Sequence, residues 1–316
     1  MEYEQFTEKF IEELENVMKQ EKVELCRMKS IKVNQILDGV SVKYPNSIVA
    51  PVIYLEEKYK CYQEGYTVHE LVKEAEEYLK NVKQNMLDKS EILVLDAKKN
   101  LYCAIINAEE NQELLKNSPH EGINDLAVIA RCKVGENSSF IVTNDLCDYL
   151  QMTSEEIIEQ AHRNTEKQTF QCKNMNQVMR DMMLAEGMPE EDVNELISMQ
   201  GMQCPIYILS NKEMIDGAAA MVSKTAMNQA REVIGEDFYI MPSSRHELML
   251  VPKTAVSDVR ELKELIKEIN GTEHSSPDRL SDNVYKYEQR TNKITFAEER
   301  KLLQNKETIK IHGRKH

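Results

Sequence analysis

The stretch FYIMPSSRHELMLVP, residues 238–252, places an apolar run on each side of a short polar segment. Apolar runs of this length, bounded by turn residues, are typical of β-strands. Pro242 and Pro252 have no backbone N–H, so each closes one run. The residues between the runs have the length of a hairpin loop, in which serine hydroxyls bond to nearby backbone. The pattern therefore predicts a β-hairpin that turns through Ser243 to His246.

The same segment contains the residue types of a hydrolytic site, and its candidate functional loop is Ser243, Ser244, Arg245, His246 and Glu247. In an extended strand His246 and Glu247 point to opposite faces, so their adjacency makes no proton relay. A nucleophilic serine also needs an oxyanion hole, which glycine-rich backbone such as G-x-S-x-G usually supplies. Residues 238–252 contain no glycine. We interpret the loop as a structural turn. A loop that recognises a ligand or a partner is the second interpretation, and a catalytic loop is the third.

The segments around this hairpin continue an α+β pattern. PIYILSN (205–211), GAAAMV (217–222) and VYKYEQ (284–289) are predicted strands, and residues 226–234 and 259–269 are predicted helices. Together with the hairpin they give a β-β-α-β-β-α-β order, which favours a mostly antiparallel sheet.

The N-terminal half combines amphipathic helices with short strands. The segments VELCRM, ILDGVSVKY and IVAPVIYL, in residues 23–55, predict an antiparallel meander. Thr67 with Glu70, and Thr153 with Glu156, predict capping boxes at the starts of two helices. The segments LYCAIINA, LAVIARCKV and FIVTN between these helices predict further strands.

These elements predict an α+β fold with two packed subdomains. The expected division is an N-terminal subdomain over residues 1–150, a helical connecting region over 151–203, and a C-terminal subdomain over 204–290. Residues 291–316 form a basic tail, which the loss of apolar periodicity predicts to be flexible.

Charge and composition bound the function. The 316 residues are 41% hydrophobic and 30% charged, with a formal net charge of −14. Nucleic-acid binding depends on Lys and Arg contacts to phosphate, so an acidic chain is a poor nucleic-acid binder outside its basic tail. The same negative charge disfavours binding to an anionic membrane surface. No apolar run has the length of a membrane-spanning helix. We expect a cytoplasmic protein whose partner is a protein; the oligomeric state stays open.

The sequence predicts no metal and no cofactor. Its seven cysteines show no C-x-x-C spacing, which indicates scattered reduced thiols. Neither H-E-x-x-H nor an EF-hand loop occurs, and the glycine-rich loops G-x-x-x-x-G-K-[ST] and G-x-G-x-x-G are also missing.

Three further residues are secondary candidates for a site. His120 and Asp125 lie in PHEGIND, a predicted loop, where an imidazole beside a carboxylate is a possible general base. The structural alternative is that Asp125 accepts hydrogen bonds from the loop while His120 lies at the surface, and we favour it. His162 lies at the edge of the apolar stripe of its helix, which favours a half-buried histidine bonded to a carbonyl.

Methionines are concentrated between residues 175 and 202, in a segment that Gly187-Met188-Pro189 divides into two predicted helices. Methionine adapts its shape, so such a pair can fill an irregular core between subdomains or form a permissive binding groove. The core is the favoured interpretation. Met179, Met182 and Met183 are the candidate groove residues.

Several stretches together resemble an uncharacterised bacterial family, domain-of-unknown-function family 5688. They are LLKNSPHEGINDLAV (114–128), TSEEIIEQAHRNT (153–165), PIYILSNKEMIDGAAAM (205–221), FYIMPSSRHELMLVP (238–252) and LSDNVYKYEQRTNKI (280–294). The resemblance implies a cytoplasmic bacterial α+β protein and brings no activity, cofactor or catalytic residue. The element order of the C-terminal half also loosely resembles the YtpQ-like family.

From these observations we expect a non-catalytic binding or regulatory protein that acts through protein contacts. The competing hypothesis is a hydrolase-like enzyme, which would use Ser243 or Ser244 with His246, or a site around His120 and Asp125. A cleft that seats two of these groups together would favour the enzyme.

Overall fold

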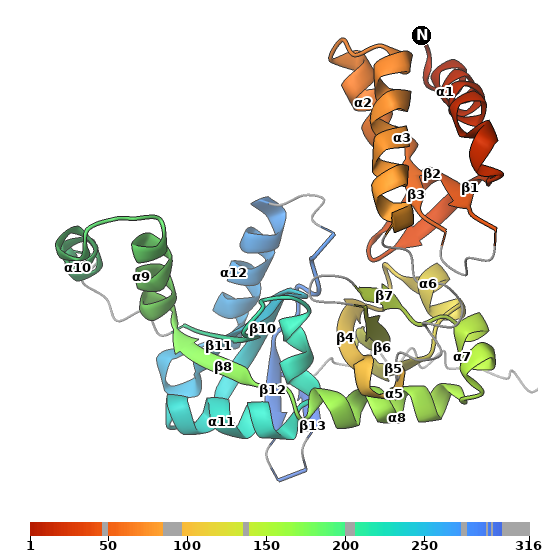
Figure 1. Cartoon of the computed structure of the whole chain (residues 1–316). Helices are drawn as coiled ribbons and strands as arrows, with labels where there is room; N and C mark the ends of the chain where they lie inside the picture. The colour runs from red at the N-terminus through yellow and green to blue at the C-terminus, as the bar shows by residue number, and fades with distance from the viewer. Residues whose placement is uncertain are drawn as a thin grey trace, which may run out of the picture.

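The computed structural model describes residues 1–45, 50–84, 97–134, 139–199, 206–272, 277–288, 290–291 and 293–298. Figure 1 shows three sheets that follow one another along the chain, with helices packed on them. Every pair of strands in the described residues is antiparallel. The α+β class predicted from the sequence is confirmed.

The N-terminal unit is a three-stranded sheet with helices on one face. Its elements are α1 (Tyr3–Met18), η1 (Lys19–Glu21), β1 (Glu24–Lys32), β2 (Gln35–Lys43), β3 (Val52–Tyr54), α2 (Leu55–Gln63) and α3 (Val68–Gln84). The strand order β1-β2-β3 confirms the predicted meander. Phe6 and Phe10 of α1 pack with Val40 of β2 in a core of their own. The N–H of Thr67 donates to the Glu70 carboxylate, which confirms the predicted cap of α3.

A four-stranded sheet follows. Its elements are α5 (Ala97–Asn100), β4 (Leu101–Asn107), α6 (Gln112–Lys116), β5 (His120–Ile123), β6 (Leu126–Lys133), β7 (Ser139–Ile141), α7 (Asn144–Leu150) and α8 (Ser154–Thr165). The central strand β6 pairs with β4, β5 and β7. Helix α8 begins at the capping box of Thr153 and Glu156, as predicted, and packs on β4.

The hairpin of residues 238–252 lies in the middle of a six-stranded sheet with the order β13-β12-β10-β11-β9-β8. The elements of this unit are β8 (Phe170–Asn174), α9 (Met175–Ala185), α10 (Glu190–Met199), β9 (Tyr207–Asn211), η2 (Gly217–Val222), α11 (Lys224–Ile234), β10 (Phe238–Ser244), β11 (Glu247–Pro252), η3 (Lys253–Ala255), α12 (Val259–Thr272), β12 (Tyr285–Glu288) and β13 (Lys293–Phe296). Strands β8 and β13, at the two edges, were not predicted from the sequence.

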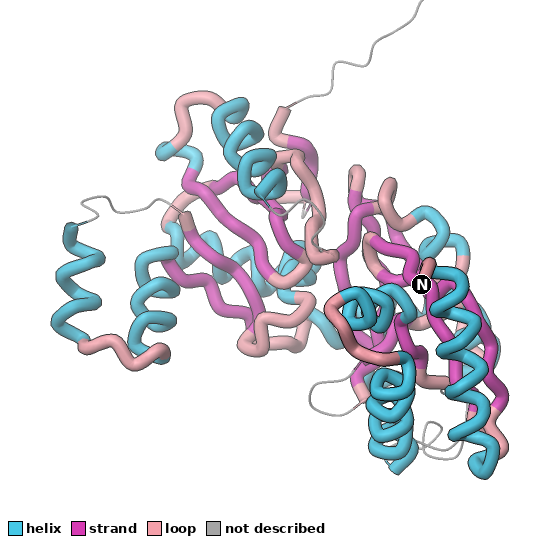
Figure 2. Tube along the Cα trace, turned by 90° about the horizontal axis from the view of Figure 1, so that it is seen from above, coloured by secondary structure: helices cyan, strands magenta, loops and turns pink. Residues whose placement is uncertain are grey.

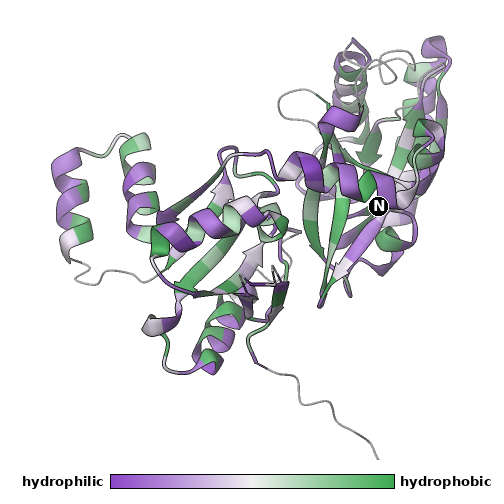
Figure 3. Cartoon of the chain, turned by 90° about the horizontal axis from the view of Figure 1, so that it is seen from below, coloured by the Kyte–Doolittle hydropathy of each residue, from purple (hydrophilic) through white to green (hydrophobic). Residues whose placement is uncertain are grey.

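The prediction of a strand at GAAAMV is wrong, because residues 217–222 form the 3-10 helix η2. Its small side chains, Ala218, Ala219 and Ala220, are buried in a core that the second and third sheets share. A turn of helix fits there because alanine lets neighbouring backbones approach closely. In Figure 3 the strands around this core are largely hydrophobic, whereas the helices carry hydrophilic outer sides. The predicted division at residues 150 and 203 stays a prediction.

The tip of the β1–β2 hairpin joins the N-terminal unit to the rest of the chain. Val33 is buried against the second sheet, in a cluster with Ile106 and Ile129. Beside it Asn34, in the left-handed region at φ 59°, donates from its side chain to the carbonyl oxygens of Pro277 (3.0 Å) and Arg279 (2.8 Å). The tip is therefore bonded to a segment far away in the sequence.

Candidate functional site

The predicted hairpin is confirmed, with a shorter turn than expected. Strand β10 extends to Ser244, which pairs with Glu247 at the start of β11, so only Arg245 and His246 form the turn. Two-residue hairpin turns usually need positive φ angles, and neither residue has one. Neighbouring segments hold the turn instead. The N–H of Arg245 donates to the Asp278 carbonyl (2.7 Å), and the Arg245 carbonyl accepts from the N–H of Ala218 (3.1 Å).

The imidazole of His246 is held by two groups that fix its tautomer. Its Nδ1 accepts from the backbone N–H of Asp216 (3.2 Å), and its Nε2 lies 3.2 Å from Oδ1 of Asp278. A nitrogen that accepts carries no proton, so the neutral ring has its proton on Nε2, facing the carboxylate. Neither nitrogen is then open to receive a proton from a nucleophile.

The two serines of the loop bond elsewhere. Ser243 Oγ donates to the sulfur of Met249, and Ser244 Oγ accepts from the backbone N–H of His246 (3.0 Å). The described hydrogen bonds thus join neither hydroxyl to the imidazole. The competing hydrolase hypothesis needs that contact, and nothing in this geometry favours it.

A buried carboxylate lies behind the turn, and sequence reasoning missed it. Asp216, between β9 and η2, is 2% exposed. Its Oδ2 accepts from the hydroxyl of Tyr102 on β4 (3.0 Å) and lies 3.2 Å from Nε of Arg131 on β6. A guanidinium nitrogen of Arg245 lies 3.5 Å from its Oδ1. We call Asp216, Tyr102, Arg131 and Arg245 the aspartate clamp; it joins the hairpin to the second sheet.

The clamp is electrostatically balanced. Burial, and then the negative charge of Asp216, raise the pKa of the Tyr102 phenol, so this group remains a neutral donor. The two guanidinium groups compensate the buried charge of Asp216 and of the Asp278 carboxylate, which Arg245 Nε contacts at 2.6 Å. Oδ1 of Asp216 accepts no hydrogen bond from the described residues, so the ion pairs with Arg131 and Arg245 hold this buried carboxylate between the two sheets.

Gly217 makes this arrangement possible. A Cβ atom there would lie 2.0 Å from Oγ of Ser210 and 2.3 Å from the carbonyl oxygen of His246. Ser210 donates to that same carbonyl (2.7 Å), so the turn, strand β9 and η2 meet at one point. Asp216-Gly217 resembles an ordinary turn signal in the sequence, but it lies in the interior. A glycine is needed at position 217 because any side chain there would clash with Ser210 and with the His246 carbonyl.

The secondary candidates do not converge. His120 lies on strand β5 rather than in the predicted loop, exposed, with Nδ1 2.9 Å from the Ser118 carbonyl. His162, half-buried on α8, lies 3.0 Å from the exposed Glu121 carboxylate rather than against the expected carbonyl. Asp125 accepts from three groups near β12 instead of the loop amides that were expected. The partners of this carboxylate are distant in sequence, and its structural role stays a prediction.

Removing the Asp125 carboxylate is expected to destabilise the fold. It accepts from Ser281 Oγ (2.7 Å), Asn283 Nδ2 (2.9 Å) and the buried Tyr285 hydroxyl. Asp125→Ala leaves these donors without their acceptor and should lower the free energy of unfolding by about 2 kcal/mol. Urea denaturation followed by circular dichroism measures this change. Equal stability of the variant and the wild type would contradict the structural role.

The methionine-rich helical pair α9 and α10 lies outside the core, which corrects the favoured interpretation. Helix α9 has no buried residue, and Met182 is 59% exposed. Figures 1 and 2 show α9 beside the β8 edge of the sheet and α10 on the far side of α9 from the strands. Helix α10 packs on α9, with Val193 buried. The Met182 side chain therefore remains accessible. Met202 lies outside the described residues.

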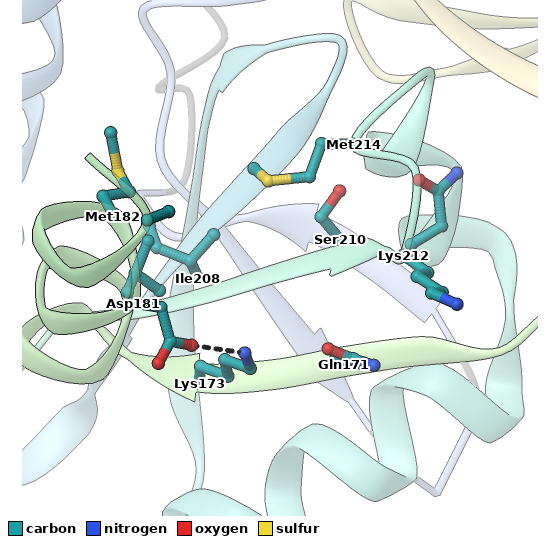
Figure 4. A pocket seen from close by; sticks show the side chains of 11 residues that line it. Gln171, Lys173, Asp181, Met182, Ile208, Ser210, Lys212 and Met214 are labelled. Carbon is teal, nitrogen blue, oxygen red and sulfur yellow. Dashed lines mark hydrogen bonds and ion pairs between the residues drawn. The ribbon is translucent and has the colours of Figure 1, made fainter. Parts of the chain in front are cut away.

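A groove runs between α9 and the adjacent edge of the sheet, with a volume of about 280 Å³ (Figure 4). We call it the methionine groove. Its lining comprises Gln171, Lys173, Val178, Asp181, Met182, Ala185, Ile208, Ser210, Asn211, Lys212 and Met214. Met182 and Met214 face it from α9 and from the loop after β9, and Ile208 forms the floor. Met179 and Met183, the other candidate groove residues, are half-buried on α9 outside this lining.

Charges in the groove are mostly paired. Lys173 Nζ lies 2.7 Å from Oδ2 of Asp181 across the groove. At the opposite end, Lys212 has no carboxylate within 4.0 Å among the described residues. Ser210 lines the groove and also holds the hairpin turn, so the two surfaces singled out from the sequence are adjacent.

No metal site is formed by His, Cys, Asp and Glu side chains in the part of the chain that the structure describes. Its cysteines are free thiols. Burial raises the pKa of Cys132 to about 11 and of Cys172 to about 12, which makes both poor nucleophiles. Among the described helices, none combines the length and the apolar character that a membrane crossing requires.

Comparison with known proteins gives one match. The model of a family of unknown function (DUF5688) matches residues 3–289. No curated protein and no solved structure matches the chain.

Proposed function

Because the chain belongs to this family of unknown function, we propose its role from the groove: a cytoplasmic binding protein that holds a segment of a partner protein through apolar contacts. The observation that carries the proposal is the exposed, methionine-lined groove beside α9. Flexible thioether side chains adapt to different partner side chains, which is the property of permissive protein-binding surfaces. The free thiols of the described residues fit a reducing compartment.

The open shape of the groove favours a polypeptide over a cofactor. Small-molecule sites usually have about 300–1,000 Å³ and enclose most of the ligand. The methionine groove has about 280 Å³ and lies open along one side. This volume suits one or two apolar side chains that anchor a larger partner, as buried anchors do at protein interfaces. Met214, which lines the groove, is 45% exposed and adds apolar surface for such a contact.

Replacement of Met182 by glutamate tests the proposal. A carboxylate in the groove must be desolvated when the partner binds. The nearby cations Arg180 of α9 and Lys173 of β8 already pair with Glu190 and Asp181. We expect cross-linked partner recovery from cells to fall about tenfold or more, as for the loss of an interface anchor. The comparison is made by quantitative mass spectrometry against the wild type, and Met182→Glu with Met183→Glu is tested in the same way.

Met28→Glu is the matched control. Met28 is 41% exposed on β1, in the N-terminal unit and remote from the groove. Both single variants replace an exposed methionine, so both should keep the melting temperature of the wild type. A partner that is recovered equally with Met182→Glu and with the wild type would refute the groove as its binding site.

A further inference from the structure

The chain leaves the described fold on the same face of the sheet as the methionine groove. Ala297, just after β13, packs in the cluster that contains Met175 and Val178 of α9. The next residue, Glu298, lies 3.9 Å from Lys263 of α12, which covers this face. The segment that follows residue 298 therefore starts on the side of the sheet to which α9 and the groove belong.

The groove is within reach of that segment. Phe296 aligns with Tyr285, Ile240, Leu250 and Tyr207 across successive strands. The four strand spacings from β13 to β9 correspond to about 19 Å. Residues 299–316 follow, and 18 residues span up to about 60 Å when extended. This length suffices for a path around α12.

Charge is complementary between the segment and the helical pair. Residues 299–316 contain six Lys or Arg and two Glu, a net charge of +4, on a chain of net charge −14. Residues 175–199 contain six Asp or Glu and one Arg, a net charge of −5. Within the described residues, Glu186, Glu191, Asp192 and Glu195 have no cation within 4.0 Å. These carboxylates face solvent and are open to cations from another segment.

The segment also carries apolar side chains between its cations: Leu302, Leu303, Ile309 and Ile311. The groove offers Met182, Ile208 and Met214 to such side chains. Among the groove's described cations, Lys212 alone has no carboxylate partner within the described residues. It lies at the end remote from Met182, so it does not repel a basic segment placed along α9 and α10 (Figure 4).

We propose that residues 299–316 of this chain dock on the helical pair, insert an apolar side chain into the methionine groove, and compete with the partner. The inference rests on the proposed function for the identity of the competing partner. An apolar anchor supplies the contact area and the charges hold the segment in place, because each alone is weak at an exposed surface. The tethered segment has a high effective concentration at the groove, so modest affinity suffices for occupancy.

Photo-cross-linking of the full chain tests the docking without any partner. The photoreactive residue p-benzoylphenylalanine replaces Met182, the purified protein is irradiated, and cross-linked peptides are mapped by mass spectrometry. We expect cross-links to residues 299–316. A mixture of ¹⁵N-labelled and unlabelled chains should give only like-with-like pairs, since the contact lies within one chain. Cross-links that join labelled to unlabelled chains, or that avoid residues 299–316, would overturn the proposal.

Two further proteins serve as controls. The same photoreactive residue at Met28, another exposed methionine, should give no cross-link to residues 299–316. The full-length variant Lys301→Glu/Lys306→Glu/Lys310→Glu should lose about tenfold in cross-link yield at Met182, because repulsion replaces attraction. An unchanged yield in this variant refutes the electrostatic part of the contact.

Partner capture separates this inference from the proposed function. In the lysine-to-glutamate variant, recovery of the partner should rise several-fold if the segment competes for the groove. Cross-linking as expected, with partner recovery insensitive to Met182→Glu, would refute the proposed function and leave the docking. Recovery that depends on Met182, without any cross-link to residues 299–316, would refute the docking and leave the proposed function.

Discussion

Gly217→Ala is expected to lower the free energy of unfolding by about 3 kcal/mol, since over-packing of an interior costs this much when backbone must move. The new Cβ would lie 2.0 Å from Oγ of Ser210 and 2.3 Å from the backbone carbonyl of His246. The serine can rotate away only by giving up its hydrogen bond to that carbonyl. The carbonyl itself belongs to the hairpin turn and can move only with it. Urea denaturation or a thermal melt measures the loss.

Two comparisons sharpen this test. Gly271→Ala changes a glycine of α12 that has no atom within 4 Å of the added methyl group. It should stabilise the protein by about 0.5–1 kcal/mol, because alanine favours helix. Adding Ser210→Ala to Gly217→Ala should recover little stability, because the clash with the His246 carbonyl remains. Wild-type stability of Gly217→Ala would show that the turn does not approach η2 as closely as the structure has it.

Asp216→Ala is expected to cost about 3 kcal/mol, the amount typical for removing one partner of a buried ion pair. The loss leaves Arg131, whose side chain is 15% exposed, without its carboxylate partner, and it leaves Arg245, 22% exposed, with Asp278 as its remaining carboxylate. It also takes an acceptor from the Tyr102 hydroxyl. Because the aspartate clamp joins two sheets, hydrogen exchange should increase at the β10–β11 turn and along β6 together.

Asp237→Ala is the matched control. Asp237 also lies between two cations, 3.1 Å from Nε of Arg231 and 3.3 Å from Nζ of Lys253, but its side chain is 50% exposed. Exposed ion pairs contribute at most about 1 kcal/mol, so this variant should stay close to the wild type. If both aspartate variants lose the same stability, burial does not distinguish the clamp and its assignment as a lock between sheets is wrong.

Local patterns predicted most of the elements. Pro252 correctly marked the end of β11, and the Thr153–Glu156 capping box correctly marked the start of α8. Pro242 did not end β10, which continues to Ser244. Strands β8 and β13 were missed because segments of five and four residues are too short for an alternating pattern to be recognised. GAAAMV was misread because alanine-rich apolar runs fit a strand or a buried turn of helix equally well.

The candidate site depended on contacts that local sequence cannot contain. Asp216 meets Tyr102 and Arg131 across 114 and 85 residues, and no spacing rule connects them. The sequence shows that the methionines of α9 are clustered. Whether this helix is buried in the core or exposed at the surface depends on the elements that pack around it. The amphipathic pattern of α9 gave no sign that its apolar side would remain half open.

The bond between the β1–β2 tip and the backbone of Pro277 and Arg279 has a consequence for the order of assembly during translation. Its two hydrogen bonds span 243 and 245 residues. The N-terminal sheet and its helices draw their core from residues 3 to 79, so they can fold while the ribosome is still making the rest. The bonds from Asn34 to the backbone of Pro277 and Arg279 must wait until residue 279 has left the exit tunnel. The same tip can meet the second sheet earlier, because Val33 packs with Ile106 and Ile129, and Asn34 exchanges hydrogen bonds with Asn111. The first unit is therefore attached in two stages, and residues 277–279 join last.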